Sequence, residues 1–134
     1  MKVQFSFNWT QEDEGGEIIH FPVAVIYAED SNGEKKYWSD ATHFVSSFNT
    51  TESVYRLLKI INLFQLENMM RKVEISHWND FEKAIIKESH IVFKERFGDS
   101  YLDQLDLSLF EKILYKWIEY LQSVDKDTVV FEVN

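Results

Sequence analysis

The tripeptide Gly98-Asp99-Ser100 could supply a nucleophilic serine, provided that a histidine lies within hydrogen-bond reach to take its proton. Hydrolases that carry such a block place the serine after a strand and the histidine later in the chain. Here the tripeptide follows a stretch with helical spacing, and the last histidine, His90, precedes it. We therefore interpret Gly98 as a helix stop and predict no catalytic residue here.

The four histidines, His20, His43, His77 and His90, could bind a metal ion, but no two are spaced as a zinc-binding helix or a His-x-His strand requires. The chain has no cysteine, which removes thiolate nucleophiles and sulfur-ligated metal sites. We predict no metal site, no cofactor and a protein that is not an enzyme. One alternative stays open, because folding could gather dispersed histidines and carboxylates into the site of a small enzyme or ligand-binding domain.

The segment Asp30-Ser31-Asn32-Gly33 has the side chains of a calcium loop but not its spacing, which places glycine sixth and a glutamate twelfth. Asn-Gly tolerates the positive φ of a tight turn, so this segment predicts a hairpin.

Strands are predicted at both ends of the chain. Apolar residues alternate with polar ones over residues 2–9, and residues 18–28 and 34–38 are rich in β-branched and aromatic residues. Pro22 cannot donate a ladder hydrogen bond, so it indicates a sheet edge or a bulge. Residues 128–133 predict a last strand, whose neighbour in the sheet stays open.

Three helices are predicted between the third strand and the last one. Asn49-Thr50-Thr51-Glu52 has the capping residues of a helix reaching about Arg71, with an apolar face broad enough to pack on more than one side. Residues 79–98 repeat this pattern, and Ser108-Leu109-Phe110-Glu111 has the form of a capping box before a third helix. Residues 39–48 fit either a helix or a strand.

Together these elements predict an α+β fold. An antiparallel sheet of three N-terminal strands and the C-terminal strand would pack with about three helices in a single domain, residues 1–134. The N-terminus alternates instead of forming a signal sequence, and no apolar run approaches the roughly 20 residues that cross a bilayer. We therefore expect a cytoplasmic protein.

Charge is the most informative property of the chain. The net charge is −9, and residues 1–34 carry seven acidic side chains against one basic, while residues 99–134 carry eight against three. An acidic surface repels nucleic acid and attracts a basic protein, although acidity also simply keeps proteins soluble. The candidate partner-binding residues are these acids and one exposed aromatic anchor: Glu12, Asp13, Glu14, Glu17, Glu29, Asp30, Glu34, Asp99, Asp103, Asp106 and Tyr115.

In general profile, a small, acidic, motif-free α+β chain, the sequence resembles the immunity proteins of bacterial polymorphic toxins, including contact-dependent growth inhibition systems. This resemblance implies a cognate basic toxin domain, possibly a nuclease, that is neutralised by direct binding. The carboxylates would then occupy a site built for phosphate. The oligomeric state stays open.

Overall fold

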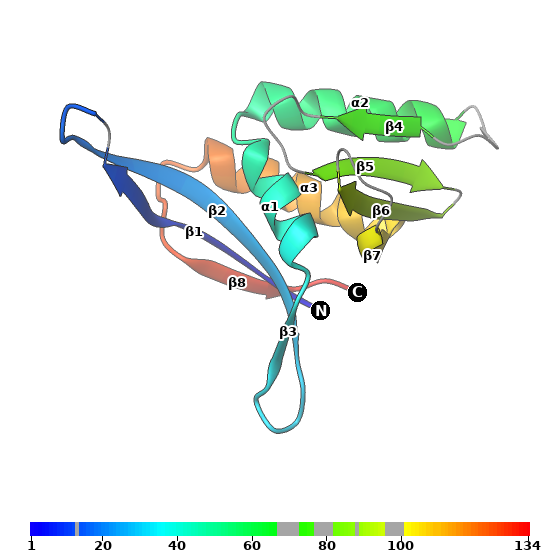
Figure 1. Cartoon of the computed structure of the whole chain (residues 1–134), viewed down its shortest axis with the longest axis horizontal. Helices are drawn as coiled ribbons and strands as arrows, with labels where there is room; N and C mark the ends of the chain where they lie inside the picture. Colours follow the sequence, from blue (N-terminus) through cyan, green and yellow to red (C-terminus); the bar gives the residue numbers. More distant parts are fainter. Residues whose placement is uncertain (13, 67–72, 77–81, 88, 96–100) are drawn as a thin grey trace.

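The computed structural model describes residues 1–12, 14–66, 73–76, 82–87, 89–95 and 101–134 (Figure 1). Strands form two antiparallel sheets, ordered β3-β2-β1-β8 and β4-β5-β6-β7, which confirms the α+β class. The elements in chain order are β1 (Lys2–Glu12), β2 (Ile18–Glu29), β3 (Lys35–Tyr37), α1 (Ser39–Ser47), α2 (Thr51–Leu66), β4 (Val73–Ser76), β5 (Glu82–Lys87), β6 (His90–Glu95), β7 (Tyr101–Asp106), α3 (Leu107–Gln122) and β8 (Val129–Glu132).

The first sheet contains the three N-terminal strands and the C-terminal strand, as predicted. β8 lies beside β1, where Val3 pairs with Phe131, and β1 continues three residues beyond the predicted end at Trp9. The β1–β2 register shifts between Ser6 and Trp9, opposite Pro22, which confirms the predicted bulge.

The predicted turn between β2 and β3 is also confirmed. Gly33 has a φ of 80° and its N–H donates to the Asp30 carbonyl over 3.1 Å. The Asp30 carboxylate accepts hydrogen bonds from the main-chain N–H groups of Asn32 and Glu34, both at 2.9 Å. Asp30 therefore closes this turn with its own side chain.

The helix predicted over residues 79–98 is wrong, because β5 and β6 form an antiparallel hairpin there. Ile85 and Ile86 are both buried, although neighbouring strand residues point to opposite faces of a sheet. A strand that is buried on both faces shows no alternation, and its short apolar runs then mimic helical spacing. The β-branched residues of these runs were the signal for strands. Residues 79–81, with the proposed cap, lie outside the described residues.

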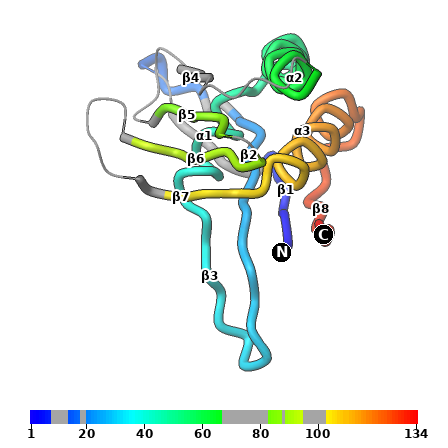
Figure 2. Tube along the Cα trace, turned by 90° about the vertical axis from the view of Figure 1, so that its right-hand side faces the viewer, coloured from blue at the N-terminus to red at the C-terminus, as the bar shows by residue number. Residues whose placement is uncertain are grey.

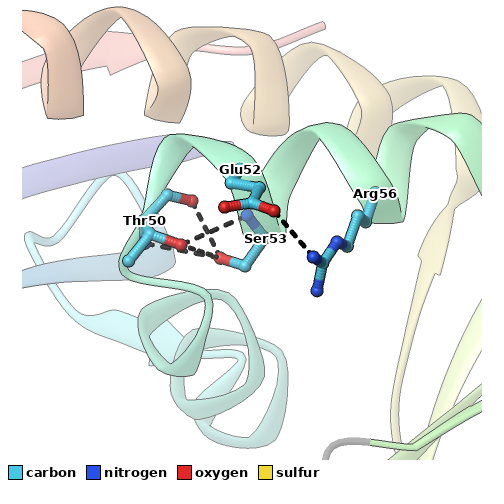
Figure 3. A network of polar contacts seen from close by, with 4 residues as sticks. All are labelled: Thr50, Glu52, Ser53 and Arg56. Carbon is cyan, nitrogen blue, oxygen red and sulfur yellow. Dashed lines mark hydrogen bonds and ion pairs between the residues drawn. The ribbon is translucent and has the colours of Figure 1, made fainter.

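Most of the segment that fitted either a helix or a strand forms α1, Ser39–Ser47, and the predicted start of α2 is confirmed. Thr50 is the N-cap: its Oγ1 accepts from the Ser53 N–H at 3.2 Å, and the Ser53 hydroxyl bonds back to the Thr50 carbonyl at 2.8 Å (Figure 3). Arg56 and Glu52 add an exposed ion pair of 2.7 Å one turn further on. α2 is described to Leu66, and the residues predicted to continue it lie outside the described part.

α3 begins two residues earlier than the capping box predicted. Asp106, not Ser108, is the N-cap, and its carboxylate accepts from the Ser108 N–H at 2.9 Å. The apolar face of α3 reaches the core as expected: Trp117 is fully buried, and its Nε1 donates to the Phe48 carbonyl over 2.7 Å.

One buried cluster joins the two sheets and the three helices. The Phe5 ring of β1 lies 4.9 Å from the Trp117 ring, and the Phe93 ring of β6 lies 5.3 Å from Phe44 and 5.7 Å from Phe110. Trp117 and Phe110 both belong to α3, so this helix packs against both sheets.

Candidate protein-binding surface

The candidate acids of the N-terminal strands do not gather on one face. Glu14 and Glu17 are exposed at the β1–β2 tip, whereas Glu29, Asp30 and Glu34 lie at the β2–β3 tip. Figure 1 shows these two tips at opposite ends of the β1–β2 ribbon. The side chain of Glu12 and all of Asp13 lie outside the described residues, as does Asp99.

The β2–β3 tip is also close to charge balance. Glu29 pairs with Lys2 at 3.4 Å, and Lys35 and Lys36 are exposed on β3 itself. The Lys35 ammonium lies 5.1 Å from the centre of the Tyr27 ring, and that of Lys36 lies 5.3 Å from the Trp38 ring. Lysines at the β2–β3 tip weaken its attraction for a basic partner.

Asp103 and Asp106 hold the starts of two helices. The Asp103 Oδ2 atom accepts from the N–H groups of Asp40 and Ala41, at 2.8 and 3.1 Å, so a carboxylate of β7 caps α1. The hydroxyl and the N–H of Ser108 lower the pKa of Asp106 below its ordinary value by hydrogen bonding to its carboxylate. Both acids therefore have a local structural role, which leaves less of their charge for a partner.

Tyr115 is the candidate residue with the most distinctive surroundings. It is 47% exposed on α3 and lines a groove of about 330 Å³ between α3 and α2. The opposite wall of this groove carries Tyr55, Leu63 and Leu66 of α2, which are 52%, 45% and 82% exposed. Exposed apolar side chains that gather in this way are typical of binding surfaces.

Tyr115 also lines a second groove, of about 320 Å³, on the other side of α3. The wall opposite α3 is formed by β8 and the residues after it, from Phe131 to Asn134, and Lys112, Lys116 and Glu119 line the α3 side of the groove. Figure 2 shows α2, α3 and β8 following one another down the right-hand side of the molecule. We call these two grooves and the ridge between them the Tyr115 surface.

Sequence reasoning selected Tyr115 but missed its neighbours. The broad apolar face of α2 was interpreted as packing on more than one side, yet Leu63 and Leu66 face solvent. Glu119 and Glu132 were not selected, because nothing in the sequence placed β8 beside α3. The breadth of the α2 face was the one available signal, since a single buried stripe needs fewer apolar positions.

A further groove, of about 440 Å³, lies between β2 and α1 and is lined by His43. Among the described residues that line it, none is a carboxylate and none is a second histidine. His20 lies elsewhere, with its ring 6.2 Å from that of Phe7, and His77 is outside the described residues. In the described part of the chain, no three histidine or acidic side chains are grouped as metal ligands. The structure therefore gives the dispersed-site alternative no support.

Comparison with protein-family models, with curated proteins and with solved structures finds no match to this chain. Over the described residues, none of the helices combines the length and the apolar character needed to span a bilayer. The Tyr115 surface and the charge of the chain are therefore the two features that bear on its function.

Proposed function

We propose that this chain is an acidic protein-binding module that neutralises a basic toxin domain, in the manner of an immunity protein. The observation that carries the proposal is Tyr115, a half-exposed aromatic side chain on a ridge between two grooves. Tyrosines anchor protein interfaces because they bury a large area and lose little side-chain entropy.

The charge of the chain supports a basic partner. A net charge of −9 speeds the approach of a cationic protein and disfavours acidic competitors. The exposed acids at the β1–β2 tip, Glu14 and Glu17, lie outside the Tyr115 surface. We assign them to the approach of the partner and the Tyr115 surface to the affinity of the complex.

The test begins with the reading frames next to this gene, one of which should encode a toxic basic domain. Co-expression of this chain should rescue growth, and the purified pair should bind. Tyr115→Ala should raise the dissociation constant by about tenfold or more, because it removes an aromatic anchor of the interface. Tyr37→Ala is the matched control, because Tyr37 is 51% exposed on β3, away from both grooves, and should leave binding within about threefold.

The contributions of the tip acids and of the Tyr115 surface can be separated by changing the ionic strength. Glu14→Gln with Glu17→Gln should slow association and flatten its dependence on ionic strength, while the dissociation rate stays unchanged. Equal loss of binding in the Tyr115 and Tyr37 variants would contradict the assignment of the surface. If no basic protein encoded next to this gene binds the chain or is neutralised by it, the proposed function is contradicted.

A further inference from the structure

Among the described strands, β8 is an edge of the first sheet, with β1 as its one neighbour. The Val133 N–H donates to the Met1 carbonyl over 2.9 Å, and Phe131 pairs with Val3. Because main-chain groups alternate along an antiparallel strand, the N–H and C=O of Val130 and Glu132 point away from β1. Within the described residues, these groups have no hydrogen-bond partner on that side.

β8 lacks several of the devices that keep another strand from adding to an edge, although it is short, with four residues, and carries Glu132. The strand contains no proline or lysine, and its pairing with β1 runs from Val129 to Glu132 without a bulge. Proteins usually protect an exposed edge with one of these devices. Val129 and Val130 are 41% and 52% exposed, and β-branched residues favour strand pairing.

The space beside this edge has the shape that an added strand requires. The groove between β8 and α3 lies along it, with Tyr115, Lys116 and Glu119 on the helix side. The Phe131 ring lies 5.0 Å from Phe5, which packs on α3, so the face of the sheet that carries Phe131 faces the helix. Every second side chain of an added strand would point into the groove toward Tyr115.

The other face of the same edge favours a basic side chain. Glu132 is exposed and forms no ion pair among the described residues. Its cross-strand neighbour Lys2 pairs with Glu29, and Lys112, which lines the groove, donates to the Asn134 carbonyl over 2.8 Å. A lysine or arginine placed opposite Glu132 would meet an uncompensated charge.

We propose that the β8 edge binds an extended segment of the basic partner as a fifth strand of this sheet. Main-chain bonds to Val130 and Glu132 would hold the segment, apolar side chains would face Tyr115, and alternate basic side chains would lie beside Glu132. The identity of the partner rests on the proposed function, but the strand-binding edge can be tested without it.

The probe is an acetylated, amidated peptide of alternating residues, Lys-Val-Lys-Val-Lys-Val-Lys. Titration into the isotope-labelled full chain should shift the amide resonances of Val130, Glu132 and Tyr115. Val130→Pro removes an N–H that the sheet does not use, so the fold should survive and the peptide should bind about tenfold more weakly. Glu132→Gln should weaken binding by about twofold to fivefold.

Two control peptides separate strand pairing from simple charge attraction. A version N-methylated at every residue keeps the charge but lacks the main-chain donors of both edges, and it should not bind. A version with glutamate in place of lysine should bind more weakly than the parent. Equal binding of the methylated peptide, or resonance shifts confined to other elements, would overturn the strand proposal.

The outcome is distinguishable from that of the proposed function. If the neighbouring toxin binds in a Tyr115-dependent manner but the peptide does not shift β8, only the strand proposal fails. If the peptide binds as expected and no basic toxin partner exists, only the proposed function fails. A dimer of this chain that forms in sedimentation and is lost in Val130→Pro would place a second copy at the edge, and would also overturn the strand proposal.

Discussion

The two sides of the first sheet differ in how the outward-facing main-chain groups of their strands are hydrogen-bonded. On the β2 side, beyond the short β3, the Ile26 N–H donates to the Thr42 hydroxyl at 2.9 Å and the Ala24 N–H donates to the Ser46 hydroxyl at 3.1 Å. The Ser46 hydroxyl also donates to the Ala24 carbonyl, at 3.2 Å. On the β8 side, the corresponding groups of Val130 and Glu132 have no such cover among the described residues.

Simple geometry explains how a helix can protect a strand edge. Thr42 and Ser46 are four residues apart, which is about 6 Å along a helix, and Ile26 and Ala24 are two apart, which is about 6.7 Å along a strand. The spacings agree closely enough for two hydroxyls to satisfy consecutive outward-facing N–H groups. Pro22 is the next outward-facing position and has no N–H to satisfy. The stretch of β2 beyond β3 is therefore closed to pairing, whereas the β8 edge is not covered in this way within the described residues.

Removing the protecting hydroxyls should have the largest effect. Thr42→Val with Ser46→Ala leaves the part-buried N–H groups of Ile26 and Ala24 without partners, at a cost of about 1–3 kcal/mol each in the free energy of unfolding. Chemical denaturation measures the loss. Thr42→Ser is the matched control, because it keeps the hydroxyl. A double variant as stable as the wild type would show that these bonds do not hold α1 on the edge.

The second-largest effect is expected at Asp103, the residue of β7 in the second sheet that caps α1. Asp103→Ala removes the acceptor for the Asp40 and Ala41 N–H groups and should destabilise the protein by about 1–2 kcal/mol. Asp103→Asn keeps an oxygen acceptor without the charge, so it should retain most of that stability. Hydrogen exchange at Ile26 and Ala24 should accelerate in the alanine variant, because a loosened α1 protects β2 less. Unchanged hydrogen exchange at Ile26 and Ala24 would show that the Asp103 cap does not help α1 to protect the edge of β2.

These contacts also mark where sequence reasoning succeeds and where it stops. β1 buries one face and alternates clearly, and β2 is rich in β-branched and aromatic residues, so these strands and the Pro22 bulge could be predicted. β5 and β6 are buried on both faces and lack that pattern. The hydroxyls of Thr42 and Ser46 gave no signal, because nothing local shows that a helical serine faces the main chain of a strand 22 residues earlier.

The residues of the candidate surface also divide into those that the local sequence could predict and those that it could not. Tyr115 could be selected because it lies off the apolar stripe of a clear helix, which is a local property. Its neighbours on α2 and β8 depend on long-range packing. Asp103 and Asp106 illustrate the converse limit: the sequence shows that they are acidic, but only the structure shows that their carboxylates bind helix N-termini. Charge can be counted from a sequence, whereas the number of free charges depends on the hydrogen bonds of the folded chain.

The smallest expected effect tests the start of α3, the helix that lines the open edge. The pKa of Asp106 is lowered in the folded protein, first by the Ser108 hydroxyl and then by the Ser108 N–H. A lowered pKa means that the ionised group stabilises the fold above its unfolded pKa, and that this contribution disappears as the pH falls below about 4. The denaturation midpoints of the wild type and Asp106→Asn should therefore differ most near neutral pH and converge on acidification. Ser108→Ala should reduce the difference, since it removes the strongest donor. A gap between wild type and Asp106→Asn that stays constant with pH would show that charge at this cap contributes nothing, and that α3 is held beside β8 by its buried face alone.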